Sequence, residues 1–450
     1  MLPRMETQRA SADSKRGDLL VNNLIYRQPQ ALSLAKSRTQ VKQFFQEADY
    51  ESAQSKTAIC DWNTGSSYID VGNSYLGFEI YAKNTAGNSP FSFGIGSVMN
   101  AIERITIRSR SGTELERLEG ANLWSRIDSD FSMSSNRKET MGSLMGMGGE
   151  PQIYDQQGVP SPRLDYTTTA SDGSFSSPVT LMIPLKRLCP FFRPLKSQLL
   201  PPQLASGLHI EIVFEKTASV FLQPDAATDL ITSYDVKDIH FLLDTVNLSD
   251  ETQKTINMES ADNGLEWVTP RVFTAKTSMP SGQNQVSVQV RKSCSQATMA
   301  YSIQQSISDL NDVKKDSMMS RVNVWKTTWQ YRIGSMFFPQ QPVVDMESFT
   351  STGAKSYYEA LYAFDKPKHP YHSGSVNIRS FNQGKSVYAM SASKNDDLFL
   401  SGLPINNSRV LEFNLEIEEP AGGESDRMLT TFLEYIQVVK CYVDNTAVAI

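Results

Sequence analysis

Hydrophobic and polar residues alternate with a period of two along most of the chain after residue 68. Because successive side chains of a β-strand point to opposite faces, each alternating run predicts a strand with one buried face. Clusters of Gly, Pro, Asn and Ser between the runs are typical of turns and loops. The chain is therefore predicted to be mostly β. The clearest runs cover 76–81, 208–214, 286–290, 329–333 and 411–417.

Helical patterns are few. Ser356 and Glu359 have the spacing of a capping box, apolar residues follow at i, i+3, i+4 and i+7, and Pro367 ends the pattern. The segment 113–127 also begins with a capping-box pair and carries a rough apolar stripe. Each half thus has strands, one helix with an irregular stretch, and strands again. This order favours two similar all-β units over one large barrel, and the polar segment 247–264 is predicted to join them.

The first 46 residues differ in charge from everything after them. They hold eight Lys or Arg and three acids, which makes the segment +5 in a chain whose net charge is −6. The segment is interpreted as an arm. A short amphipathic helix is predicted after Pro29, and it either packs on its own domain or remains a contact element. The apolar positions of that helix are Leu34, Val41, Phe44, Phe45 and Ala48.

Length and composition bound the class of protein. A chain of 450 residues is longer than one ordinary core usually fills, so two domains are expected. An acidic net charge argues against a protein whose whole surface binds phosphate backbones. No apolar window approaches a membrane span, and a soluble protein made in a reducing compartment is expected. The four cysteines are far apart in sequence and are predicted to be unpaired, buried thiols: Cys60, Cys189, Cys294 and Cys441.

Candidate chemistry is sparse. His209 and His240 fall in strand patterns, where an in-register polar position is the simpler interpretation. His369 and His372 form an H-x-x-H pair, but a metal site needs further ligands and no Cys or carboxylate close in sequence can be nominated, so a solvated, Pro-flanked loop is the favoured interpretation. No Walker A, H-E-x-x-H or G-x-S-x-G motif occurs. We therefore expect no catalytic, cofactor-binding or metal site, and no enzyme.

Several stretches in order along the chain resemble one family. They are similar to the double jelly-roll major capsid proteins of eukaryotic double-stranded DNA viruses, on the polinton-like virus, adintovirus and virophage side of that lineage. The resemblance runs through residues 60–450 and does not reach the arm. Its stretches are 74–80 (SYLGFEI), 97–116, 183–214, 329–342 (WQYRIGSMFFPQQP) and 396–415.

The resemblance implies an all-β fold of two consecutive eight-stranded jelly rolls, a double jelly roll, with decorated loops containing short helices. Combined with the patterns above, it divides the chain into four parts. These are a basic N-terminal arm at 1–56, a first jelly roll at 57–248, a linker at 249–265 and a second jelly roll at 266–450.

The implied function is that of a major capsid protein. Its homotrimer forms a pseudo-hexagonal capsomer that tiles the icosahedral shell of a virion, and the chain is made in the host cytoplasm. The implied partners are the other two copies, neighbouring capsomers, and minor capsid and vertex proteins. The arm is hypothesised to meet genomic DNA, an internal membrane or acidic patches of adjacent subunits. Its candidate contact residues are Arg27, Lys36, Arg38, Lys42, Phe44 and Phe45.

Two rival functions share the β pattern. A carbohydrate-binding or glycosidase-like sandwich needs a cleft with convergent acids and aromatics, and none can be nominated from the sequence. A minor capsid protein of the vertex carries a single jelly roll, which the apparent duplication disfavours. The aromatic-rich segment 329–338 is a candidate for packing near the trimer interface, although its alternation is explained more simply by the core of the second domain.

Overall fold

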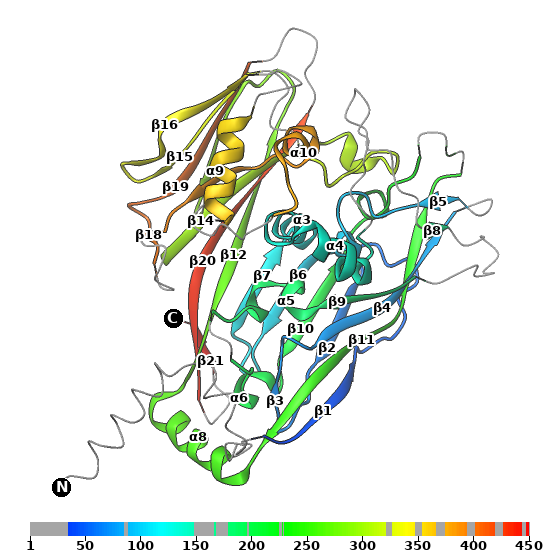
Figure 1. Ribbon diagram of the computed structural model, residues 1–450, viewed down its shortest axis with the longest axis vertical. Coiled ribbons are helices and arrows are strands. Elements are labelled where there is room, and N and C mark those ends of the chain that lie inside the picture. The colour runs from blue at the N-terminus through cyan, green and yellow to red at the C-terminus, as the bar shows by residue number, and fades with distance from the viewer. Residues whose placement is uncertain are drawn as a thin grey trace, which may run out of the picture.

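The computed structural model of the protein describes residues 35–84, 89–147, 166–167, 179–195, 198–224, 227, 229–320, 326–346, 353–365, 374–393, 401–418, 426–442 and 447–449. Within these residues the chain forms two β-sandwiches that follow one another in sequence and lie side by side (Figure 1). Each sandwich consists of two antiparallel sheets with four main strands each.

The first sandwich uses strands from Ala35 to Leu248. One sheet has the order β1-β11-β4-β9, with β1 at Ala35–Phe44, β11 at Ser233–Leu248, β4 at Tyr75–Lys83 and β9 at Val179–Pro184. The other has the order β2-β10-β6-β7, with β2 at Thr57–Asp61, β10 at His209–Phe214, β6 at Ile102–Arg108 and β7 at Glu114–Glu119.

The second sandwich repeats this plan. One sheet has the order β12-β20-β14-β17, with β12 at Leu265–Met279, β20 at Arg427–Cys441, β14 at Cys294–Ser306 and β17 at Tyr388–Ser391. The other has the order β13-β19-β15-β16, with β13 at Gln285–Val290, β19 at Leu411–Glu418, β15 at Lys326–Ile333 and β16 at Met336–Met346.

The two sandwiches have the same topology. When the main strands of each are counted along the chain, both read 1-8-3-6 in one sheet and 2-7-4-5 in the other. Eight antiparallel strands joined in this Greek-key order across two sheets are a jelly roll. The predicted double jelly roll is therefore confirmed, and the predicted runs at 76–81, 208–214, 286–290, 329–333 and 411–417 fall on its main strands.

Helices and short strands occupy the connections. In the first jelly roll they are β3 (Tyr68–Ile69), β5 (Pro90–Phe91), η1 (Val98–Ala101), α3 (Ala121–Ser132), α4 (Ser135–Thr140), η2 (Gly142–Met145), β8 (Tyr166–Thr167), α5 (Leu185–Leu188), η3 (Pro190–Phe192), α6 (Pro202–Ala205) and α7 (Thr217–Val220). Those of the second are η4 (Asp309–Asn311), α9 (Ala354–Asp365), α10 (Ile378–Gly384), β18 (Leu403–Ile405) and the terminal β21 (Ala447–Ala449). Helices α3 and α9 occupy equivalent connections, between the fifth and sixth main strands.

Helix α8 (Asp250–Asn263) joins the two jelly rolls and coincides with the polar segment predicted to do so. Ser249 caps it, because its hydroxyl accepts a hydrogen bond from the backbone N–H of Thr252. Gly264 follows the last turn and leads directly into β12. The segment 249–264 is thus a capped helix that projects from one end of the molecule (Figure 1).

Two helix predictions need correction at their starts. The segment 113–127 begins as strand β7, and its helix starts only at Ala121, because Gly120 reverses the chain with a φ of 67°. The second helix, α9, is present but begins before Ser356, so the predicted capping box is wrong. The buried Ser356 hydroxyl instead accepts a hydrogen bond of 2.7 Å from the Trp329 indole and donates one to Asp345.

The apolar core of the first jelly roll continues across the boundary into the second. Trp267, Tyr301 and Phe432 belong to β12, β14 and β20, yet they pack in this first core cluster. Leu433, the neighbour of Phe432 on the opposite face of β20, lies in the separate core inside the second sandwich. The sheet β12-β20-β14-β17 is thus covered on both faces, and side chains on both faces of β20 are buried.

Charged side chains complete this interface between the jelly rolls. The Asp130 carboxylate of α3 lies 2.5 Å from Lys138, 2.9 Å from Arg126 and 3.3 Å from Lys385 of the second jelly roll. Arg126 also donates to the carbonyl of Gly384 at 2.8 Å. Burial alone would raise the pKa of Asp130, but the three cations outweigh it and hold that pKa well below its ordinary value.

Replacing Asp130 with Asn tests this charge cluster. The variant leaves three buried or nearly buried cations without their carboxylate, so we expect the free energy of unfolding to fall by about 3–5 kcal/mol in chemical denaturation. Glu418→Gln is the matched control, because Glu418 pairs with Lys326 on the surface and its loss should cost less than about 1 kcal/mol. Equal effects of the two substitutions would show that the cluster does not hold the jelly rolls together.

The pH dependence of stability tests a second buried carboxyl at this interface. Burial raises the pKa of Glu116 to about 7, although the Arg271 guanidinium lies 3.6 Å away. The folded state therefore holds a proton that the unfolded state releases near pH 4.5, and stability falls as the pH rises from there to about 7. Glu116→Gln removes this fall. We expect the free energy of unfolding of the variant, relative to that of the wild type, to rise by about 3 kcal/mol between pH 4.5 and 7.5. Chemical denaturation at each pH measures this difference. A difference that does not change with pH would contradict the raised pKa of Glu116.

Candidate assembly surfaces

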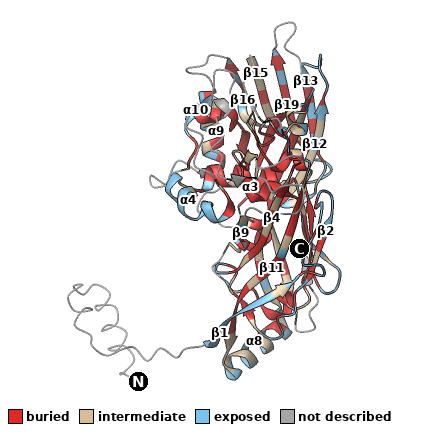
Figure 2. Ribbon diagram, turned by 90° about the vertical axis from the view of Figure 1, so that its right-hand side faces the viewer, coloured by how far each residue is buried: buried red, intermediate tan, exposed pale blue. Residues whose placement is uncertain are grey.

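Strand β1 lies at the edge of its sheet and is exposed along most of its length. It pairs antiparallel with β11 from Ala35 opposite Leu248 to Phe44 opposite His240. Its other edge has no partner among the described strands, and Figure 2 shows its exposed surface. The amphipathic helix predicted after Pro29 is therefore wrong for residues 35–44. Neither face of this edge strand is covered, so its sequence does not alternate between apolar and polar residues as a half-buried strand does.

The basic side chains of β1 are partly used inside the chain. Arg38 donates to both carboxylate oxygens of Asp244 and contacts Asp70 at 2.5 Å. Its hydrogen bonds, first with Asp244 and then with Asp70, raise the pKa of Arg38. Lys42 forms an ion pair of 3.0 Å with Asp238. These contacts fix β1 against β11.

The remaining predicted arm residues have different positions. Lys36 is exposed and makes no ion pair with any residue in the described part of the chain. Arg27 lies outside the described residues. Phe44 and Phe45 point to opposite sides of the strand, with Phe44 62% exposed and Phe45 only 5% exposed. The Phe45 ring stacks on Phe241 at 5.1 Å between centroids, so this residue belongs to the core and not to a contact surface.

A second exposed surface runs along β16 and α9. Strand β16 ends the sheet order β13-β19-β15-β16, and Phe337 and Val344 on it are exposed. Tyr358 and Tyr362 lie one turn apart on α9 and are exposed as well, Tyr358 by 57%. Large apolar side chains gathered on an edge strand and the adjacent helix are typical of protein contact surfaces. The sequence pattern did not single out α9 for this role.

The segment 329–338 divides between core and surface. Trp329, Tyr331 and Ile333 are fully buried in the core of the second jelly roll. The Tyr331 hydroxyl also contacts the Ser302 hydroxyl at 2.8 Å inside that core. The interpretation of this run as second-domain core is confirmed. Arg332 on β15 and the β16 residues Met336 and Phe337 are exposed.

The side chains that could take part in acid–base chemistry or metal binding are histidines, cysteines and acidic residues. His209 lies on β10 between Asp61, at 2.7 Å, and Glu211, at 3.2 Å. Within the described residues no three His, Cys, Asp or Glu side chains are grouped so as to hold a metal ion, and no helix there is long and apolar enough to cross a membrane. His369 and His372 lie outside the described residues.

The cysteines are unpaired, as predicted. Cys60, Cys189 and Cys441 are buried, and Cys294 is partly exposed. Burial raises the pKa of the Cys60 and Cys441 thiols to about 12. Thiols with such pKa values are protonated at neutral pH and are poor nucleophiles.

Comparison with solved structures places this architecture in one fold class, the double jelly roll of viral capsid proteins. The protein of the PBCV-1 virus capsid matches with a TM-score of 0.59 and 9% identity, over 94% of this chain and 98% of that chain. The Faustovirus major capsid protein matches at 0.58 and 8%, over 96% and 94%. The mavirus major capsid protein matches at 0.53 and 10%, also over 96% and 94%. At these identities the likeness shows the fold. The chain matches no protein-family model and no curated protein.

The neighbours Phe44 and Phe45 offer a matched test of how β1 is placed. Phe45→Ala removes a buried ring, and we expect it to lower the free energy of unfolding by about 3–5 kcal/mol. Phe44→Ala removes an exposed ring from the neighbouring residue, the last of β1, and should change stability by less than about 0.5 kcal/mol. Denaturant titration of both variants measures the difference. Equal losses, or the reverse order, would mean that β1 does not lie on β11 in this register.

Proposed function

We propose that the chain is a major capsid protein, the subunit that builds the shell of a double-stranded DNA virus. The observation that carries this proposal is the pair of jelly rolls of identical topology, matched over nearly the whole length of this chain and of the capsid proteins. The second jelly roll is packed on the first through a continuous core. Two jelly rolls that share a core form one rigid unit, which suits a subunit of a closed shell.

We propose the following division of labour along the chain. Residues 1–34 form the basic arm, since β1 belongs to the first sheet and shortens the predicted arm of 1–56. The first jelly roll then covers 35–248, the linker is α8, and the second jelly roll covers the remainder. Three copies form a capsomer with six jelly rolls, and the exposed edge strands and the α9 face supply contacts between copies. Neighbouring capsomers, minor capsid proteins and vertex proteins are the further proposed partners, and the virion is the proposed location.

The mass of the purified protein in solution tests the proposed trimer. Light scattering should give about three times 50.2 kDa at moderate concentration, because six domains that tile a shell need an interface larger than the roughly 1,600 Å² of a standard complex. A carbohydrate-binding sandwich has no such requirement. A species that stays at 50.2 kDa over the whole accessible concentration range contradicts the proposal.

Truncation tests the role of the arm. Deleting 1–34 removes five Lys or Arg and three acids but leaves β1 in place, so we expect a folded trimer that closes shells poorly. Deleting 1–46 is the comparison: it also removes β1 and Phe45 and should lower stability. Electron microscopy of assembled particles and denaturation separate the two effects. Normal closed shells that package DNA from the shorter deletion would show that the arm is dispensable.

A further inference from the structure

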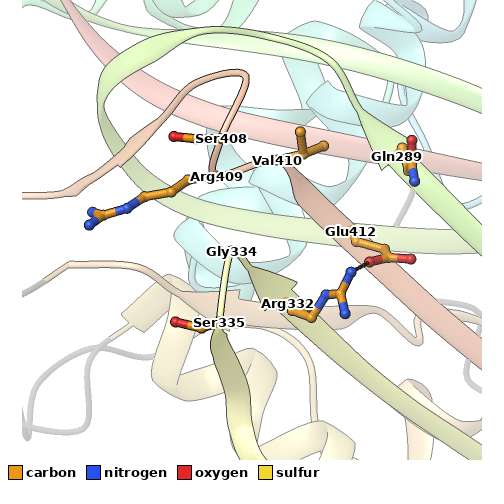
Figure 3. Close-up of a pocket in the computed structure, with 8 residues that line it drawn as sticks. All are labelled: Gln289, Arg332, Gly334, Ser335, Ser408, Arg409, Val410 and Glu412. Carbon is orange, nitrogen blue, oxygen red and sulfur yellow. Dashed lines mark ion pairs between the residues drawn. The ribbon is translucent and has the colours of Figure 1, made fainter.

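A polar recess of about 500 Å³ opens at one end of the second jelly roll (Figure 3). The strand register explains why it forms there. Val290, at the end of β13, and Ile333, at the end of β15, both pair with Leu411 at the start of β19. The turns that adjoin these three strands therefore meet at one edge. The recess is lined by Gln289, Arg332, Gly334, Ser335, Ser408, Arg409, Val410 and Glu412.

The lining offers hydrogen-bond donors and few free acceptors. Glu412 is its only acidic residue, and both of its carboxylate oxygens are engaged. Arg332 contacts one oxygen at 2.6 Å, and the Ser287 hydroxyl donates to the other at 2.7 Å. A ligand for this recess must therefore supply its own acceptors, and the guanidinium and hydroxyl donors favour an anion.

Arg409 is the unused cation of the recess. Its side chain is exposed, and its guanidinium forms no ion pair or hydrogen bond with any described residue. It extends from the β18–β19 turn on the side away from Arg332 and Glu412 (Figure 3). Gly334 stands between them with a φ of 61°, and a Cβ there would lie only 3.2 Å from Arg409 Cγ. The glycine thus permits the tight turn and leaves room beside the arginine.

The surroundings of the recess add positive charge. The β13–β14 connection adjoins the same edge and carries Arg291, which is exposed, and Lys292. The lining itself holds Arg332 and Arg409 against Glu412, a charge of +1 in a chain of net charge −6, and Arg291 adds an exposed cation beside it. Lys292 lies over the Phe273 and Tyr435 rings, 5.9 and 5.7 Å from their centroids. Charge of one sign in a concave, polar site concentrates ligands of the opposite sign.

We propose that this recess binds a backbone phosphate of DNA. A phosphodiester presents two unesterified oxygens that match the fork of Arg409, and the Ser335 and Ser408 hydroxyls lie within the same recess. Val410 is the only apolar residue of the lining; Met336 and Phe337, which follow Ser335 on β16, are exposed but do not line the recess. DNA is favoured over a membrane surface for the recess itself, because membrane-surface sites combine basic residues with inserted apolar ones. The absence of aromatic residues from the lining leaves no base to be stacked, so binding is independent of sequence. This inference rests on the proposed function in one respect: if the chain is a capsid protein, the DNA is the packaged genome.

The test compares two arginine reversals in the full-length protein. Arg409→Glu changes the recess, and Arg110→Glu makes the same charge change in the exposed β6–β7 turn, the counterpart in the first jelly roll of the β15–β16 turn that carries Gly334. Binding of a fluorescent 20-base-pair DNA duplex is followed by anisotropy between 50 and 200 mM salt, and competition by inorganic phosphate is measured alongside. We expect Arg409→Glu to weaken binding at least about tenfold and to flatten the salt dependence, and Arg110→Glu to weaken it less than about threefold.

Several results would overturn the proposal. The first is an equal loss of DNA affinity in the two variants, and the second is an unchanged DNA affinity in Arg409→Glu. The third is that Arg409→Glu loses binding to vesicles containing anionic lipid but not to DNA. Loss of self-association in Arg409→Glu with DNA binding intact would identify an acidic group of a neighbouring copy as the ligand, and would also overturn it. Thermal unfolding of both variants controls for folding. Because DNA binding and solution mass are separate measurements, a trimer whose Arg409→Glu variant binds DNA normally refutes this inference and leaves the proposed function standing.

Discussion

The structure depends on one contact, the burial of the outer face of the β12-β20-β14-β17 sheet against the first jelly roll. A sandwich normally leaves the outer face of each sheet to solvent, but here Phe432 faces the first jelly roll while Leu433 faces the interior of the second. Since apolar burial is the main favourable term in folding, separating the two sandwiches would expose a second core. The charge cluster around Asp130 adds to this contact, because the Asp130 carboxylate of the first jelly roll lies 3.3 Å from the Lys385 ammonium of the second.

This contact decides which strands and faces of the molecule remain exposed. With one sheet of the second jelly roll covered, the remaining free edges are strands such as β1 and β16 and the outer side of α9. Open edges and exposed apolar side chains are costly in a protein that remains single, because they invite association with other chains. We propose that they are the places where copies of the chain meet. The turns at the end of the second jelly roll remain polar and positively charged, and so are suited to a different kind of partner.

Much of the fold could be predicted from the sequence because half-buried strands alternate strictly. Runs such as 286–290 and 411–417 have one face in the core and one toward solvent, and the period of two reveals them directly. Strands that do not alternate were not predicted from the pattern. β20 is buried on both faces and β1 on neither, so neither strand alternates, and the pattern around β1 wrongly predicts a helix. The burial that decides such cases comes from partners distant in sequence, which local patterns do not contain.

The candidate surfaces were harder to predict than the fold. Phe44 and Phe45 look alike in sequence, and only the pairing of β1 with β11 separates the exposed ring from the buried one. Arg38 looked free for an external anion, but Asp70 and Asp244 reach it across distances of 32 and 206 residues along the chain. The recess at Arg409 depends on three turns that come together through strand register, and no single segment carries its signal.

We propose that the two jelly rolls, locked together by their buried contact, form the repeating unit of a threefold capsomer. Electron microscopy of single particles of the purified, full-length protein tests it most directly. The account predicts class averages with threefold symmetry and six similar lobes, each the size of one jelly roll, arranged as a near-hexagon. Averages that show isolated two-lobed particles, or lobes whose separation varies from class to class, would contradict it.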